Sequence, residues 1–215
     1  MYSELASDGC PDTVVILGPN HYGIGSGVSA MVEGAWQTPL GEVEIDSLFA
    51  KQIYKNSGII DIDETAHINE HSIEVHLPFL QYIYGSRFKF VPISMMMQDL
   101  RTSRSVGESI ANSTGDRDVL VIASTDLSHY EPQEQAERKD RLVMDAVLKL
   151  DEEELMRVVE QENISMCGYG PVASAIVAGK ILGAKVSKVL SYHTSGDVTG
   201  DYGQVVGYMS ARIGR

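Results

Sequence analysis

The chain has 215 residues, of which 43% are hydrophobic and 22% are charged. This length suits one domain, and the composition is that of an ordinary globular protein rather than of a disordered or collagen-like chain. Lys and Arg total 17 against 30 Asp and Glu, which gives a net charge of -13. Nucleic-acid phosphates and anionic membrane surfaces repel so acidic a chain, and we predict neither as a partner.

Cysteine usage and the N-terminal stretch point to the compartment. Two cysteines, Cys10 and Cys167, are too few for a disulfide framework, and no apolar run approaches the roughly 20 residues of a membrane span. The N-terminal stretch lacks the basic and apolar segments of a signal peptide. We therefore predict a cytoplasmic protein. Residues 1–8 have the character of a helix that ends at Gly9, where glycine can take a left-handed conformation.

Apolar runs of strand length recur along the chain. The runs at 13–17 and 119–123 are uninterrupted, which is typical of strands covered on both faces. Residues 88–95 alternate more, and Pro92 indicates an edge position or a local break there. Further strands are expected at 188–193 and 204–210, and a small antiparallel hairpin within 24–46.

Helical patterns separate these strands. Helices are expected at 47–56, 70–84, 100–112, 133–148, 152–160 and 171–182. Pro78 must kink the second helix or delay its start, and Pro171 is expected at the first position of the last one. Strands that alternate with helices predict an α/β fold: an α/β/α sandwich with a mixed, mostly parallel central sheet, built as a single domain over residues 1–215.

Two buried strands are followed by similar polar loops. The first runs into Asn-His-Tyr at 20–22, and the second into Ser-Thr-Asp-Leu-Ser-His-Tyr at 124–130. Ligands of open α/β sheets bind beyond the carboxyl ends of the strands. If the two strands are adjacent and parallel, His21 and His129 face a common crevice, with Asp126 close enough to orient an imidazole. The alternative is that each histidine caps a turn or stacks on its tyrosine.

A cysteine in a glycine-rich turn is the third candidate. Cys167 precedes a predicted helix start, where a thiol ionises more readily and can act as a nucleophile or a soft metal ligand. A lone cysteine is also often a small buried apolar residue. Cys10 has no such surroundings and is expected to be structural.

The fourth candidate segment is Asn69 to Pro78. On a helix, His71 and His76 would point about 140° apart, so only one of them can face a site. His71, flanked by Glu70 and Glu74, could serve as a general acid or base, or could belong to a solvated polar helix end.

Four segments together resemble one known family. They are Gly-Pro-Asn-His-Tyr-Gly at 18–23, Glu-His-Ser-Ile-Glu-Val-His-Leu-Pro-Phe-Leu at 70–80, Ser-Thr-Asp-Leu-Ser-His-Tyr at 124–130 and Cys-Gly-Tyr-Gly-Pro at 167–171. In this order and spacing they resemble the Memo family (mediator of cell motility), essentially over the whole chain. The fold of that family is similar to the class III extradiol dioxygenases, which are non-haem iron enzymes. The resemblance implies an α/β/α sandwich with a pocket at one rim of the sheet.

The resemblance also implies site residues. It places metal ligands at His21, at Cys167 and at the histidine of an upstream Pro-His-Ala-Gly-Tyr motif. It makes His129 the proton-transfer candidate, Asp126 its orienting neighbour and His71 a supporting or acid–base residue. The upstream motif is absent from the sequence. We therefore expect that the reading frame starts too late, at an internal methionine, and that the N-terminal strand and histidine motif are missing; His129 could then serve as third ligand.

Three functions follow from these candidates. The first is a metal-dependent redox enzyme of the dioxygenase type that uses iron or copper, although this shortened form could also bind no metal. The second is a non-catalytic module that binds a small molecule or a peptide. The third is a metal-assisted hydrolase in which His129 and Asp126 activate water. The sequence names no substrate and no oligomeric state.

Overall fold

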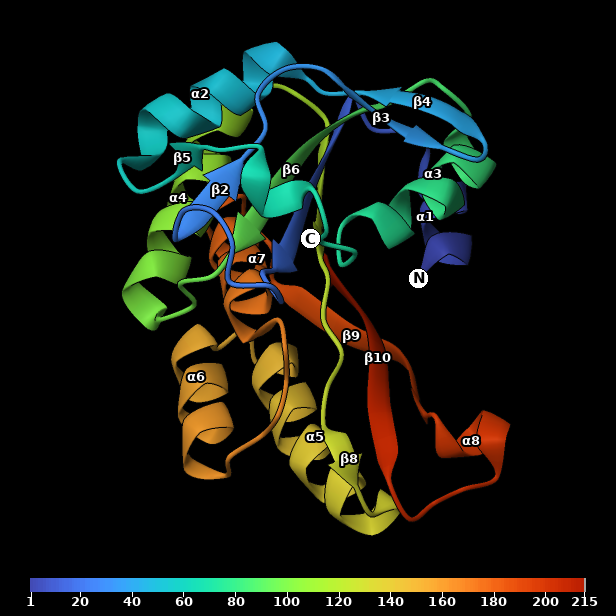
Figure 1. Ribbon diagram of the computed structural model, residues 1–215. Helices are drawn as coiled ribbons and strands as arrows, with labels where there is room; N and C mark the ends of the chain where they lie inside the picture. Colours follow the sequence, from blue (N-terminus) through green and yellow to red (C-terminus); the bar gives the residue numbers. More distant parts are fainter. Residues whose placement is uncertain (215) are drawn as a thin grey trace.

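A mixed five-stranded sheet forms the centre of the protein. The computed structural model describes residues 1–214 and orders this sheet β5-β2-β6-β1-β7. β1 is parallel to both β6 and β7, whereas β2 is antiparallel to β6. Figure 1 shows α2 and α4 on one side of the sheet and α1 with α3 on the other. The prediction of an α/β fold with a mixed, mostly parallel sheet is confirmed.

The described elements alternate as the sequence patterns indicate. The strands are β1 (Thr13–Pro19), β2 (Val28–Ala30), β3 (Ala35–Thr38), β4 (Gly41–Glu44), β5 (Asp61–Ile62), β6 (Lys89–Met95), β7 (Val119–Ala123), β8 (His129–Glu131), β9 (Val186–Thr194) and β10 (Val205–Gly214). The helices are α1 (Tyr2–Asp8), α2 (Ser47–Ser57), α3 (Leu77–Tyr84), α4 (Leu100–Thr114), α5 (Gln133–Leu148), α6 (Glu152–Gln161), α7 (Tyr169–Ile181) and α8 (Gly196–Thr199), with short 3-10 turns at Thr65–His67 and Glu74–His76. Within residues 1–214, no helix has both the length and the apolar character that crossing a bilayer requires.

The two closing strands form a sheet of their own. β9 and β10 are antiparallel partners, and β8 pairs with the other edge of β10. Together with α5 and α6 they make up the lower half of the view in Figure 1. The predicted hairpin within 24–46 is confirmed as β3 and β4, which pair with each other as a two-stranded sheet. The same segment contributes β2 to the central sheet, which the sequence reading did not predict.

Strand β6 corrects the prediction made from Pro92. β6 lies between β2 and β1 in the sheet, so the edge position is wrong. Its ladder with β2 covers only Ile93 to Met95, however, and stops one residue short of Pro92. The missing amide hydrogen is therefore tolerated where β2 does not reach, while β1 pairs with β6 along its whole length.

Helix starts differ from the predicted ones at two prolines. Residues 70–73 are not helical, and α3 begins only at Leu77, so Pro78 delays the helix rather than kinking it. α7 begins at Tyr169, which puts Pro171 at its third residue instead of its first. Both prolines remain in the first turn, where the amide hydrogens have no partner within the helix.

Helix α7 joins two hydrophobic clusters. One cluster fills the space around the central sheet, and the other lies among α5, α6 and the β9–β10 pair. Ala178 belongs to the first, whereas Ala173 and Ile176 belong to the second. Since α7 is buried on more than one side, it lacks a polar face over most of its length. This position fixes the start of α7, and with it Cys167, against the carboxyl ends of the sheet strands.

Gly18, near the end of β1, lets the 70–73 segment approach the strand closely. A Cβ atom at Gly18 would lie 2.8 Å from Cγ1 of Ile73 and would also collide with the Ser72 side chain. The Ser72 hydroxyl donates a hydrogen bond to the Pro19 carbonyl at 3.1 Å. The 70–73 segment can therefore pack directly on β1 only because position 18 carries no side chain.

We predict that Gly18→Ala lowers the free energy of unfolding by about 1–3 kcal/mol, because the buried Ile73 and Ser72 side chains have no room to move away. Urea denaturation measures the change. Gly214→Ala is the matched control, since its added methyl group would come no closer than 3.9 Å to another group, and it should change stability by less than about 0.5 kcal/mol. Equal stability of the two variants would refute the packing argument.

Candidate functional site

The loops that follow β1 and β7 leave the sheet side by side. The two strands are parallel neighbours in which Leu17 pairs with Ala123, and the Ser124 amide donates to the Leu17 carbonyl at 2.8 Å. This confirms that the strands before His21 and before Asp126 are adjacent and parallel. Both loops therefore start from the same rim of the sheet, where ligands of α/β proteins bind.

His21 is held by a buried carboxylate. Its backbone amide donates to Oε2 of Glu70 at 2.6 Å, and its ring Nδ1 lies 2.8 Å from Oε1 of the same residue. The Glu70 side chain is 1% exposed, against 34% for the His21 side chain. Asn20 shapes the turn, because its side-chain oxygen accepts from the amides of Tyr22 and Gly23. The imidazole is thus fixed at one nitrogen and open to solvent elsewhere.

Glu70 is an anchor that the sequence reading named only as a neighbour of His71. Burial raises the pKa of its carboxyl, but the hydrogen bonds from His21 and from the Ser72 amide outweigh this and leave the pKa below its usual value. A carboxylate accepts hydrogen bonds and cannot donate them, so Nδ1 of His21 must carry the proton. The Nε2 atom of the neutral ring then holds the free lone pair. The partners are 49 positions apart in the sequence, which explains why no local pattern revealed the pair.

His71 lies beside this pair rather than on a helix. Its ring stacks on the His21 ring with centroids 4.8 Å apart, and its Nδ1 is 3.5 Å from Oε1 of Glu70. Its side chain is 56% exposed. The structure therefore brings His71 to His21, and its accessible ring can exchange protons with solvent. Its role in acid–base chemistry stays a prediction.

Cys167 contacts the loop after β7. Its Sγ accepts the Asp126 amide hydrogen at 3.1 Å, and its own amide donates to the Asp126 carbonyl at 3.3 Å. Gly168 donates to Oγ1 of Thr125 and caps the start of α7. Burial raises the pKa of the Cys167 thiol despite the amide contact. The expected ease of ionisation of this thiol is therefore wrong, because loss of hydration outweighs the hydrogen bonds from Asp126 and Thr125, which lower its pKa.

His129 is also fixed through Nδ1. It opens the short strand β8, and its Nδ1 lies 2.8 Å from the carbonyl oxygen of Ser165, whose hydroxyl also accepts from the His129 amide. Its Nε2 is 3.8 Å from Oδ2 of Asp126. That separation is an ion-pair distance and too long for a hydrogen bond. Ser165, which the sequence reading did not select, therefore orients the ring, and Asp126 supplies a nearby negative charge.

The predicted site residues thus form two contact groups at one rim. His21 and His71 gather around Glu70, while Asp126, His129 and Cys167 form the second group. Among the residues described, His21, Glu70 and His71 can offer three ligand atoms within 4.8 Å of one another. Glu70 already accepts three hydrogen bonds, however, which suits a residue that supports a ligand better than a ligand itself.

The three other histidines lie away from these groups. His193 is exposed and pairs with Asp197. His76 is held by the hydroxyl of Tyr2, which lies 2.5 Å from its Nδ1. His67 is 7% exposed. The expected helical geometry of His71 and His76 is wrong, because His71 precedes the helix, and that only one of them faces the site stays a prediction.

Comparison with known proteins identifies the family. The sequence profile of the family described as Memo-like protein matches residues 1–212. This chain belongs to the Memo-like family. It is 57% identical over 209 residues to a MEMO1 family protein of the archaeon Methanopyrus kandleri, a match that covers 96% of this chain and 74% of the relative. A MEMO1 family protein of Sulfolobus acidocaldarius is 50% identical over 215 residues, covering 99% of this chain and 75% of the relative.

One solved structure shows the same fold. The crystal structure of an uncharacterised protein from Escherichia coli K12 matches this Memo-like chain with a TM-score of 0.66, over 96% of this chain and 90% of the other. The two sequences are 14% identical, so the likeness concerns the fold alone. The resemblance to the Memo family read from the four motifs is therefore confirmed, and the roles of the individual site residues stay predictions.

We predict that stability falls as the pH drops from about 7 to about 5. Burial lowers the pKa of His67 and of His76 to about 4, whereas unfolded histidine titrates near 6.5. Below pH 6.5 the unfolded chain takes up protons that the folded protein cannot, so each histidine costs roughly 2 kcal/mol of stability by pH 5. The loss of stability continues until the pH falls below about 4, the pKa of the two histidines in the folded protein.

Urea denaturation at a series of pH values measures this loss. His67→Phe should reduce it by about half, because one of the two depressed pKa values is gone. A wild-type protein as stable at pH 5 as at pH 7 would contradict the assignment.

Proposed function

We propose that this Memo-like protein is a metal-dependent redox enzyme of the oxygenase type, with iron or copper held by His21 and Cys167 at the rim beyond β1 and β7. His129 is its proton-transfer group, with Asp126 beside it. The observation that carries the proposal is the way His21 is fixed. A buried carboxylate holds its Nδ1, which leaves Nε2 as the free donor, and this arrangement is typical of metal-binding histidines.

The donor types fit such a metal. An imidazole nitrogen and a thiolate suit copper and iron better than the hard cations magnesium and calcium. The amide hydrogen that Asp126 directs at Sγ of Cys167 stabilises negative charge on sulfur. Burial keeps the free thiol protonated, so loading a metal would release a proton from Cys167. A bound iron or copper ion would supply the one-electron chemistry that amino-acid side chains lack.

His129 is suited to accept a proton from a substrate. The Ser165 carbonyl requires a hydrogen on Nδ1, so the free lone pair is on Nε2. The Asp126 carboxylate, 3.8 Å from Nε2, would stabilise the imidazolium that forms. A hydroxyl group bound between the two contact groups could therefore lose its proton to His129. His71, stacked on His21 and exposed, could pass protons to solvent.

We predict that the purified protein, loaded anaerobically with copper(I) or iron(II) and then desalted, retains about one metal ion per chain. His21→Ala and Cys167→Ala should each reduce metal affinity at least tenfold, since each removes a donor atom. Elemental analysis with a competing chelator measures this. Cys10→Ala is the matched control, because Cys10 is the other cysteine and the hydrogen bond of its Sγ goes to the Pro11 carbonyl, away from the rim groups.

Oxygen uptake with catechol tests the chemistry. His129→Gln should retain the metal and lose roughly a hundredfold in rate, as expected when a general base is removed. Failure of the wild type to retain metal, or equal metal loss in Cys10→Ala and Cys167→Ala, would refute the metal site. Metal retention without oxygen uptake would leave a hydrolase or a binding module and would refute the redox assignment.

A further inference from the structure

A cavity lies against the residues on either side of the segment that carries Glu70 and His71. It has a volume of about 580 Å³, which is within the usual range for sites that bind small molecules. It opens between the β3–β4 hairpin and the 64–78 segment. Its walls are Met31, Trp36, Gln37, Thr38, Pro39, Glu64, His67, Ile68, Glu74, Val75, Leu77 and Pro78. None of these belongs to the rim groups, so the cavity is separate from the proposed metal site.

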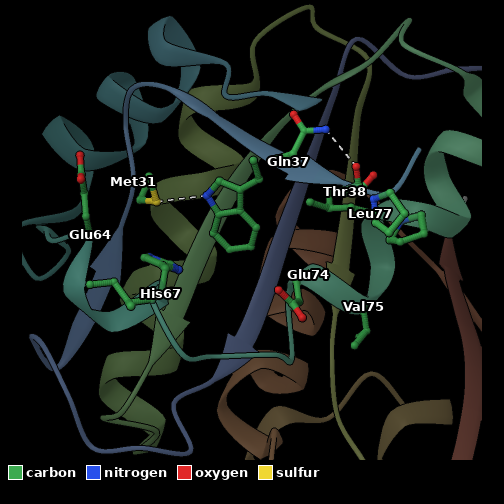
Figure 2. A pocket seen from close by; sticks show the side chains of 12 residues that line it. Met31, Gln37, Thr38, Glu64, His67, Glu74, Val75 and Leu77 are labelled. Carbon is green, nitrogen blue, oxygen red and sulfur yellow. Dashed lines mark hydrogen bonds between the residues drawn. The ribbon is translucent and has the colours of Figure 1, made fainter. Parts of the chain in front are cut away.

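The cavity is apolar with two acidic groups. Glu64 and Glu74 contribute carboxylates, and none of the wall residues found within 1–214 is Lys or Arg. In Figure 2, His67 lies between Glu64 on one side of the cavity and Glu74 on the other. Asp63 and Glu70 add negative charge close to the imidazole. The cavity therefore attracts cations and repels anions.

His67 is a buried polar group that finds no partner within residues 1–214. It is 7% exposed, and neither ring nitrogen makes a hydrogen bond to another described residue. A backbone group of Ser29 lies near the ring but outside hydrogen-bond geometry. Leaving such a group unpaired is costly, and native proteins rarely retain one without a use for it. Burial lowers the pKa of His67 to about 4, so at neutral pH the ring is uncharged and one nitrogen can accept a hydrogen bond.

The side of the cavity next to His67 is aromatic. The Trp36 ring meets the His67 ring edge-on with centroids 5.7 Å apart. The Nε1 of Trp36 donates a hydrogen bond to the sulfur of Met31 at 3.2 Å. Aromatic faces attract cations, and the exposed side chains of Ile68 and Val75 line the mouth with apolar surface. Both nitrogens of His67 are shielded from solvent. A ligand would reach them by moving the imidazole relative to Trp36.

The arrangement favours an organic cation over a metal ion. Glu64, His67 and Glu74 do not bring three ligand atoms together, since the residues of the described chain that do so are His21, Glu70 and His71. A compact metal ion could not contact the separated groups at once, whereas an organic molecule can span them. We propose that this cavity binds a small organic ammonium ion with an apolar body, whose charged nitrogen donates to His67 and lies near Glu64 and Glu74.

The single tryptophan of the chain makes the proposal directly testable, because Trp36 forms part of the cavity wall. Titration of the purified protein with benzylamine should change the tryptophan emission saturably, with a dissociation constant of about 1 mM or tighter. Benzyl alcohol, which has nearly the same shape without the charge, should bind at least tenfold more weakly, and benzoate should not bind. Equal responses to the three compounds, or a tighter response to benzoate, would overturn the proposal.

Variants separate the contributions. Glu64 and Glu74 are exposed, so replacing either should not disturb the fold. Glu74→Gln and Glu64→Gln should each weaken benzylamine binding severalfold without changing benzyl alcohol binding. Glu108→Gln, an exposed glutamate on α4 outside the cavity, is the matched control and should bind as the wild type does. His67→Phe should raise the melting temperature, because an unpaired polar group is removed, and should weaken benzylamine binding about tenfold. Unchanged benzylamine affinity in all three cavity variants would refute the site.

Discussion

The contact between Glu70 and His21 is the interaction on which the rest of the site depends. A carboxylate that is 1% exposed would be strongly destabilising without partners, and here the amides of His21 and Ser72 and the His21 ring supply them. This pairing joins the loop after β1 to a segment 49 residues further along the chain. It also decides which nitrogen of His21 carries the proton. One buried charge thus sets both the path of the chain and the chemistry of the ring.

The fold brings the second contact group to the same rim. The parallel pairing of β1 with β7 sends both loops in the same direction, and α7 starts where its first residues meet the loop after β7. Cys167 therefore contacts Asp126 across 41 residues of sequence, and His129 is oriented by Ser165 in the approach to the same turn. Each polar side chain has its partner on a different element. The two groups consequently depend on the packing of α7 between its two hydrophobic clusters.

Features with a local or periodic signal could be predicted from the sequence. The apolar runs that became β1 and β7, the helices at α2, α4, α5 and α6, and the four family motifs all have such signals. Contacts between residues far apart in the chain left no such signal in the sequence. The anchoring role of Glu70 and the contact of Ser165 were overlooked because their partners are distant, and β2 was overlooked because three residues show no pattern. Desolvation reversed the expected thiol acidity of Cys167, since local sequence does not report burial.

Two kinds of histidine emerge from these contacts. His21 and His129 have one nitrogen fixed by an acceptor and the other free, as a ligand or a base requires. Among the residues that the structure describes, His67 has no hydrogen-bond partner at either nitrogen, and it faces a separate acidic cavity. The same 64–78 segment thus contributes Glu70 to the rim and His67 to the cavity behind it. The two proposed sites can be tested with separate variants, because no residue of the two rim groups lines the cavity.

The protonation state of His21 tests the central claim most directly. Nitrogen-15 NMR of the imidazoles at neutral pH should show His21 with a protonated Nδ1 and a free Nε2 in the wild type. Glu70→Gln should weaken this preference, because the Gln side chain has one acceptor oxygen in place of two and cannot accept at both positions that the carboxylate fills. The exposed Glu74→Gln should keep it. A wild-type His21 protonated at Nε2 alone, or one unaffected by Glu70→Gln, would contradict the account.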